Sequence, residues 1–341
     1  SWWMPINMKL VKAISIITPH QKENNQQSFK IVNHTQTDLP ITISINKFKT
    51  TLLLQAGKTS EEILVPIEYL ICGTNPVNIL LPNGTIVSDR LINWSVSTPK
   101  KTFEKIDLTA SFNDKVTQIF KNKYLSPRPQ VTTLQLPWQG SGDWPHPHET
   151  PAVDDSGLRK LAGANNSIFI PQGVPFATPS QSDQKNVVYT SQWDNYPKEV
   201  LIPLNGKAAH AYFMMAGSTN PMQSQLENGL VEIEYTDGSK AHLSLRNPET
   251  WWPIEEDYYT DGYAFHLKQP RPIRVHLKTG EIVSGEQSKA KFNGKAIDGG
   301  AATILDLPLD SLKTLKSIKL KTIANDVVIG LMAVTLLRNE D

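Results

Sequence analysis

The sequence predicts an all-β protein made of two antiparallel β-sandwich domains, the second a jelly roll, with one short connecting helix. Short runs rich in β-branched residues recur along most of the chain, as at residues 41–45 and 231–235. Tight-turn signals separate several of these runs. Asn83-Gly84 favours a type I′ hairpin turn, and Asp237-Gly238 lies between two alternating strands. Apolar residues at helical spacing stand out in one segment, residues 107–122.

These signals place the domain boundaries. The strand-rich residues 1–97 predict the first sandwich, and residues 98–159 predict a linker that holds the helix and a long irregular loop. Strand signals return after that loop, so residues 160–341 are expected to form the jelly roll. Trp2 and Trp3 form a costly apolar start, so we expect the chain to be a piece of a longer protein.

Composition narrows the class of protein. The 341 residues include 34 basic and 33 acidic side chains without an arginine-rich run, so nucleic acid is not an expected partner. No apolar run approaches the roughly 20 residues that a membrane-spanning helix needs, so no membrane span is expected. Cys72 is the single cysteine and follows an apolar stretch, which predicts a buried structural thiol rather than a disulfide.

The most informative segment, residues 247–265, mixes tryptophans and tyrosines with carboxylates. Flat rings can stack on sugar faces, and carboxylates accept hydrogen bonds from sugar hydroxyls. The alternative is a loop that folds back and buries its own aromatic rings. A second loop of similar composition, residues 191–197, lies between two predicted strands. The predicted ligand-binding residues are Trp193, Asp194, Trp251, Trp252 and Glu255.

Paired acids raise the possibility of catalysis. Asp154, Asp155, Glu255 and Asp257 are candidates for the proton donor and the base or nucleophile of a glycosidase, although acids in loops are commonly only solvated. Asp154 and Asp155 could also bind calcium together with backbone oxygens, and no other metal or cofactor is expected. The chain has no phosphate-binding loop and no dinucleotide fingerprint, which argues against a nucleotide cofactor.

Five segments carry a resemblance to a known family. The segments are YLSPRPQVTTLQLPWQGSGDWPHP, VDDSGLR, SQWDNYPKEVLIPLNGKAAHAYFMMAGSTNPMQS, NPETWWPIEEDY and ANDVVIGLMAVTLLR. They look like the C-terminal β-rich portion of a large, poorly characterised bacterial family whose members resemble six-hairpin glycosidases of polysaccharide-degrading systems. The closing strand is also similar to that of galactose-binding-like jelly rolls.

The resemblance implies a helical toroid upstream, with the catalytic cleft in that toroid. The chain is therefore expected to be a non-catalytic accessory region that can bind glycan, at the cell surface or in the periplasm of a bacterium. Two alternatives stay open. The acids of this chain could contribute to a glycosidase site, or the sandwiches could only support the missing helical domain.

Overall fold

A computed structural model gives the structure of the chain, and it describes residues 12–17, 26–98, 101–122, 124, 152–193, 195–219, 223–256, 267, 269–284 and 297–338. The chain divides into two compact units, Ser1–Val96 and Ser97–Asp341. Both consist of antiparallel strands, so the predicted all-β fold is confirmed. Within the described residues, no helix has the length and apolarity to cross a membrane.

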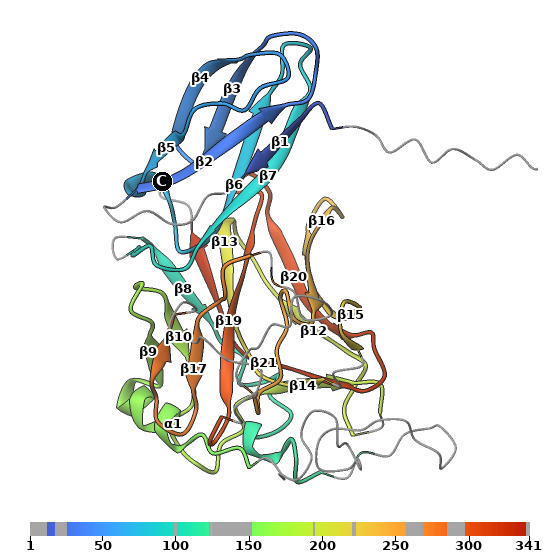
Figure 1. The fold of residues 1–341 in the computed structure, drawn as a ribbon. Coiled ribbons are helices and arrows are strands. Elements are labelled where there is room, and N and C mark those ends of the chain that lie inside the picture. Colours follow the sequence, from blue (N-terminus) through green and yellow to red (C-terminus); the bar gives the residue numbers. More distant parts are fainter. Residues whose placement is uncertain are drawn as a thin grey trace, which may run out of the picture. The chain divides into compact units, whose positions relative to one another are not determined.

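In its described residues the first unit is a sandwich of seven strands, drawn in blue to cyan in Figure 1. Its hydrophobic core lies between the two sheets, where the side chains of Phe29, Ile43 and Ile79 are fully buried. Three strands against four is the immunoglobulin-like arrangement. One sheet contains β1 (Ile14–Ile17), β2 (Gln26–Asn33) and β5 (Ile63–Pro66), and the other β4 (Phe48–Leu54), β3 (Leu39–Ile45), β6 (Gly73–Leu80) and β7 (Ile86–Asn93), with the 3-10 turn η1 (Ile67–Tyr69) after β5.

The hairpin between β6 and β7 forms where Asn83-Gly84 predicted it, with a different turn. Within this turn only Gly84 has a positive φ, of 83°, whereas a type I′ turn needs two such residues. The backbone N–H of Gly84 donates to the carbonyl of Leu81, and the N–H of Leu81 donates to the carbonyl of Thr85. Pro82, whose ring fixes a negative φ, therefore starts a type I turn that Gly84 completes.

The second unit is a larger sandwich with two packed sheets. Phe213 and Val334 of one sheet and Ile233 and Leu320 of the other meet in one buried core. The larger sheet contains β11 (Val188–Ser191), β21 (Val327–Arg338), β13 (Ala208–Met215), β19 (Ala301–Pro308), β17 (Arg274–His276) and β18 (Ile282–Val283), with β8 (Phe103–Ile106) and β14 (Ser218–Thr219) also paired to β21. The smaller sheet contains β12 (Glu199–Pro203), β20 (Leu315–Thr322), β15 (Glu227–Tyr235) and β16 (Lys240–Arg246).

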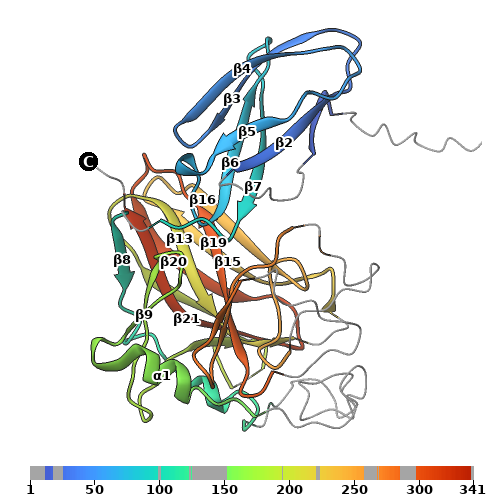
Figure 2. The same ribbon diagram turned by 60° about the vertical axis from the view of Figure 1, so that its left-hand side comes forward.

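Short elements cover the outer face of the larger sheet. They are α1 (Ser156–Ala162), the 3-10 turns η2 (Val116–Gln118) and η3 (Gly163–Asn165), and the hairpin of β9 (Ser167–Phe169) and β10 (Pro175–Ala177). Both ribbon views show β9 beside α1 (Figure 2). The hydroxyl of Thr335 on β21 donates to the carbonyl of Pro175 at 2.5 Å, which ties the hairpin to the sheet.

The helix predicted for residues 107–122 is wrong in position. These residues contain only the 3-10 turn η2, and the α-helix is α1. The apolar side chains of Val116 and Ile119 are buried as the pattern implied. The side chain of Asn113 instead fixes this segment against Tyr189. Its amide nitrogen donates to the carbonyl of Tyr189 at 2.8 Å, and its amide oxygen accepts the N–H of Tyr189 at 2.8 Å.

The segment expected to be a linker also differs. Strand β8 pairs with β21 from Phe103↔Leu337 to Ile106↔Val334, so residues 103–106 extend the larger sheet. Helix α1, near the end of the expected linker, contacts β9 and β17 of the same unit. The described residues of this segment are therefore integral to the second sandwich.

Candidate functional site

A pocket opens on the second unit where the larger sheet is interrupted. Strand β21 has β8 along one edge up to Val334, and along the same edge β11 begins at Leu331. Between these two partners, Met332 is an extra residue of β21, because Met214 pairs with Ala333 and Met215 with Leu331. Such β-bulges bend a strand and are common beside functional sites.

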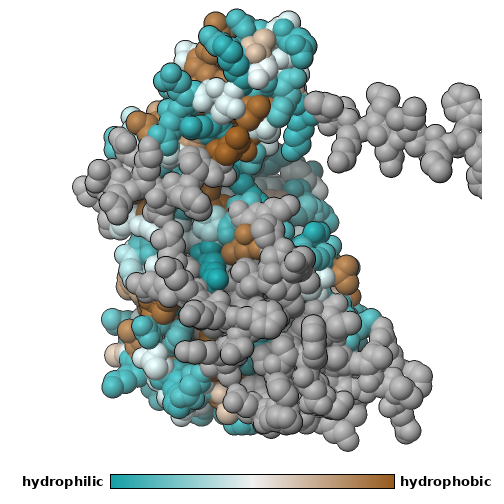
Figure 3. All heavy atoms as spheres, in the orientation of Figure 1, coloured by the Kyte–Doolittle hydropathy of each residue, from teal (hydrophilic) through white to brown (hydrophobic). Residues whose placement is uncertain are grey.

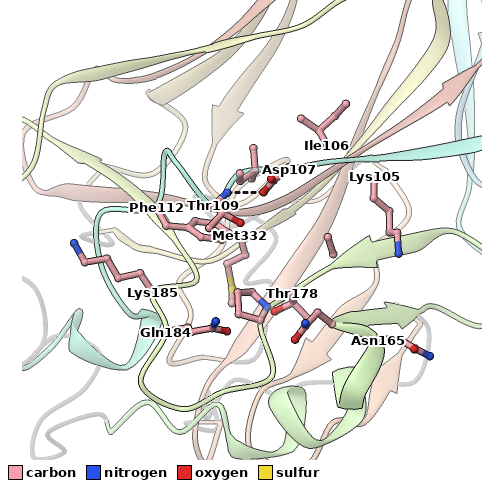
Figure 4. Close-up of a pocket in the computed structure, with 14 residues that line it drawn as sticks. Lys105, Ile106, Asp107, Thr109, Phe112, Asn165, Thr178, Gln184, Lys185 and Met332 are labelled. Carbon is pink, nitrogen blue, oxygen red and sulfur yellow. Dashed lines mark hydrogen bonds between the residues drawn. The ribbon is translucent and has the colours of Figure 1, made fainter.

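The pocket has a volume of about 460 Å³, within the range of small-molecule sites. Figure 4 shows its walls converging from the end of β8, the turn after α1, the segment after β10, and β21. The wall combines apolar groups with amides, hydroxyls and charges. Its residues are Lys105, Ile106, Asp107, Leu108, Thr109, Phe112, Asn165, Asn166, Ala177, Thr178, Pro179, Gln184, Lys185 and Met332.

A turn after β8 brings Phe112 into the pocket. The Asp107 carboxylate accepts the N–H of Thr109 at 2.9 Å, drawn as a dashed line in Figure 4. The carbonyl of Leu108 then accepts the N–H of Phe112 at 3.0 Å. Hydrogen bonds from the side chain and backbone of Thr109 hold the pKa of Asp107 below its ordinary value, so this acid is ionised at neutral pH.

The opposite wall is fixed by two buried or strained groups. Asn166 adopts a left-handed conformation, with φ of 46°, and its side-chain oxygen accepts the N–H of Ser180 at 2.8 Å. Arg159 of α1 donates to the carbonyls of Pro179 at 3.2 Å and Gln184 at 3.0 Å, and also to that of Gln181. One guanidinium therefore shapes the loop that presents Pro179 and Gln184 to the pocket.

Thr178 is the most informative residue of this wall. Its side chain is 1 % exposed, and its hydroxyl has no hydrogen-bond partner among the residues that the structure describes. A buried hydroxyl without a partner costs about 1–3 kcal/mol, so folded chains rarely retain one without a reason. The oxygen is shielded from solvent in this structure, so a ligand hydroxyl would become its partner once the Thr178 side chain turns toward the pocket.

An exposed aromatic ring lies on the hairpin of β9 and β10, which also contributes to the pocket wall. Phe169 is 65 % exposed and shares a face of β9 with Ser167, because side chains alternate along a strand. Ser167 accepts a hydrogen bond from Nζ of the pocket residue Lys105 at 3.0 Å. On the face that Figure 3 shows, the coloured hydrophobic residues lie in small patches between hydrophilic ones.

The tryptophans predicted to stack on sugars are buried instead. Trp251 is 1 % exposed and Trp252 is 3 % exposed. A Cβ atom on Gly217 would lie 2.8 Å from the Trp251 ring, so the glycine makes room for the indole. Trp193 is 5 % exposed and packs on Tyr124, with ring centroids 5.2 Å apart. These rings therefore correspond to the alternative of a loop that buries its own aromatics.

The candidate acids occupy three different environments. Asp154 accepts the N–H of Ser156, the first residue of α1, at 2.9 Å. Asp155 accepts hydrogen bonds from Arg159 and Asn186 at 2.9 and 2.8 Å, so hydrogen-bond donors rather than a metal ion surround its bonded oxygen. Asp194 and Asp257 lie outside the described residues. Within the described part of the chain, no group of three or more His, Cys, Asp and Glu side chains is placed to hold a metal ion.

Glu255 and Glu256 form a buried acid pair near Arg274. Ser218 donates its hydroxyl to the Glu255 carboxylate at 2.9 Å, and both acids are less than a tenth exposed. Burial raises the pKa of Glu255 to about 7, with smaller opposing contributions from Ser218 and Arg274. Burial and the neighbouring Glu255 carboxylate raise the pKa of Glu256 well above its ordinary value.

The sequence did not point to the pocket residues. Thr178, Gln184 and Lys185 belong to no motif in the sequence, and Phe112 lies in the segment predicted to be a helix. The left-handed Asn166 is the one local signal, because asparagine tolerates this conformation at turns. The other residues meet only through the tertiary fold.

No model of a known protein family matches the chain, and no curated protein matches it. Two solved structures are similar over most of its length. One is a SusE-like protein, with 11 % identity and a TM-score of 0.22, covering 91 % of each chain. The other, described as the structural basis for promiscuous specificity of carbohydrate-binding modules from the β-sandwich superfamily, has 9 % identity and a TM-score of 0.18, covering 95 % of this chain and 97 % of that one. TM-scores this low carry no argument about this chain, so its function is argued from its own residues.

Proposed function

We propose that the chain is a non-catalytic, carbohydrate-binding region of a larger bacterial glycoside-hydrolase-like protein, and that the pocket beside Met332 holds one sugar unit. In this proposal the preceding part of the protein is a helical catalytic domain, and the protein works in the periplasm or at the cell surface. The observation that carries sugar binding is the mixed polar and apolar lining of the pocket, in which Thr178 has a buried hydroxyl without a partner among the described residues.

The chemistry of the wall fits a sugar better than an apolar ligand. A sugar ring has hydroxyls around its edge and apolar C–H groups on its faces. The side chains of Thr178, Gln184 and Asn165 offer hydrogen-bonding groups, while Phe112 and Met332 offer apolar surface. Few apolar ligands would use so many polar groups, because each would lose hydration without gaining a partner.

Phe169 extends the proposal beyond one sugar. Its exposed ring lies on the face of β9 that also holds Ser167, the partner of Lys105 in the pocket wall. An aromatic face of this kind stabilises a sugar by stacking on its C–H groups. A neighbouring unit of the same glycan would then stack on Phe169 while the first unit occupies the pocket.

Calorimetric titration of the whole chain with a panel of neutral and acidic oligosaccharides tests the proposal. We expect dissociation constants on the order of micromolar to millimolar, since few groups are involved. Thr178→Val keeps the side-chain shape and removes the hydroxyl, so it should weaken binding about tenfold without lowering the melting temperature. Thr51→Val, at an exposed position on β4 in the other unit, should change neither property.

Phe169→Ala should weaken the binding of oligosaccharides more than that of single sugars. Leu201→Ala is the matched control, because Leu201 is 60 % exposed on β12 of the smaller sheet. Absence of binding to every glycan on the panel by a folded chain would contradict the proposed function and favour a purely structural role.

One observation favours an enzyme as the second candidate. A glycosidase needs a carboxylic acid with a raised pKa as proton donor, and Glu255 and Glu256 both have raised pKa values. Both side chains are buried by the described residues, at 5 % and 7 % exposure, so a substrate would need an opening beside them. Hydrolysis of any tested glycan by the chain, lost in Glu255→Gln, would support this candidate.

A further inference from the structure

We propose that the pocket selects an anionic glycan, whose charged group pairs with Lys105 or with Lys185, which lie at opposite sides of the pocket. This inference rests on the proposed function and names the class of sugar that the same pocket takes. It concerns the charge of the ligand, which the hydroxyl of Thr178 and the apolar residues of the wall do not determine.

Two lysines flank the pocket. Lys105 leaves β8 at one side and Lys185 follows Gln184 at the other, as Figure 4 shows. Nζ of Lys105 is 3.0 Å from the neutral Ser167 hydroxyl, a contact that positions the ammonium group without neutralising it. In the described part of the chain, neither lysine forms an ion pair with a carboxylate.

Several other lysines of the second unit differ in this respect. Lys240, Lys278, Lys313 and Lys316 each have a carboxylate oxygen within 3.0 Å of Nζ. Their partners are Glu232, Asp298, Asp237 and Glu234. The two lysines at the pocket therefore keep an unneutralised charge where a ligand would meet it.

The single acid of the wall does not cancel this charge. Two lysines at +2 and Asp107 at −1 give the lining residues a net charge of +1 at neutral pH. The carboxylate of Asp107 accepts the N–H of Thr109 in its own turn, so one of its acceptor sites is occupied by the backbone. Lysine binds carboxylate and sulfate as a compact point charge, so either group satisfies the geometry.

The lysines and Thr178 divide the recognition between them. A uronic acid or a sulfated sugar has one anionic group and several hydroxyls on the same ring. One of the two ammonium groups would bind the anion, and the hydroxyl of Thr178 and the amides of Asn166 and Gln184 would bind the hydroxyls. A neutral sugar would leave both ammonium groups without a counter-charge.

The test compares ligands that differ only in charge. A galacturonic acid oligomer should bind the whole chain at least tenfold more tightly than the same oligomer with methyl-esterified carboxylates. A sulfated oligosaccharide of equal length separates carboxylate from sulfate as the preferred anion. Raising the salt from about 0.05 to 0.5 M should weaken the binding of the acidic ligand and leave the esterified one little changed.

Variants locate the effect. Lys105→Gln and Lys185→Gln should each weaken the acidic ligand about three- to tenfold and leave the esterified ligand within twofold. Lys160→Gln is the matched control, because Lys160 is exposed on α1 and does not line the pocket. Equal affinity for charged and esterified oligomers would overturn the anion proposal and leave sugar binding intact, whereas binding of none of the ligands would overturn the proposed function itself.

Discussion

Arg159 and Asp155 form a buried ion pair one turn apart on α1, with Nε 2.9 Å from Oδ2. The pair connects the helix to the pocket, because the remaining guanidinium nitrogens hold the carbonyls of Pro179, Gln181 and Gln184. Asn186 donates to the same oxygen of Asp155 at 2.8 Å. An acid that the sequence offered as a catalytic candidate thus positions the loop that forms one wall of the pocket.

Arg159→Lys should loosen this wall. Lysine keeps the charge beside Asp155 but cannot donate to three separate carbonyls in the plane of a guanidinium. We expect faster amide hydrogen exchange in residues 179–185, unchanged exchange in β20, and at least fivefold weaker sugar binding. Lys160→Gln on the solvent side of the same helix should change neither measurement. Unaltered exchange in the loop of the variant would contradict the positioning role.

Trp251→Ala should unfold the second unit more easily, since the ring belongs to its core and is 1 % exposed. Removing a buried indole costs about 3–5 kcal/mol. Trp251→Phe should cost less, because it fills part of the space and removes an indole N–H without a partner among the described residues. Denaturant titration followed by circular dichroism measures both. Loss of sugar binding by Trp251→Ala at unchanged stability would restore the stacking role that the sequence suggested.

The strands were predictable because their residues report burial locally. Residues 327–337 are almost entirely apolar, as expected for a strand with both faces covered, and they form β21 with burial along nearly its whole length. The same apolar run conceals the bulge. Side chains three residues apart on a regular strand point to opposite faces, yet Leu331 and Val334 both belong to the core because the bulge lies between them. No polar residue of the sequence marks this change of face.

The site was less predictable because its groups converge only in the fold. The sequence cannot distinguish a tryptophan on a surface from one in a core, and the room for Trp251 comes from Gly217, more than 30 residues away. The helix assigned to residues 107–122 failed for a related reason. Helical spacing reported the burial of Val116 and Ile119 correctly, but the amide of Asn113 bonds to Tyr189 of a distant strand.

Asn75→Ala should destabilise the first unit by about 2–3 kcal/mol. The side chain is fully buried, and its amide donates to the carbonyls of Ile71 and Gly73 while its oxygen accepts the N–H of Ile71. Truncation leaves these backbone groups without partners, which costs more than the bonds contribute. Asn78→Ala, exposed on the same strand, should cost less than 1 kcal/mol. Hydrogen exchange of β6 resolves the two effects, and equal protection in both variants would contradict this account.

Glu255 should make folding more stable in mild acid. Burial raises its pKa from 4.5 to about 7, so its contribution is complete below about pH 4.5 and is lost as the pH rises through 7. At 1.36 kcal/mol per unit the loss is at most about 3 kcal/mol. Glu255→Gln should therefore flatten the fall in unfolding free energy between pH 5 and 8, measured by urea titration. Glu199→Gln, exposed on β12, should leave the wild-type slope intact. Parallel pH curves for the wild type and Glu255→Gln would show that Glu255 titrates like a solvated acid.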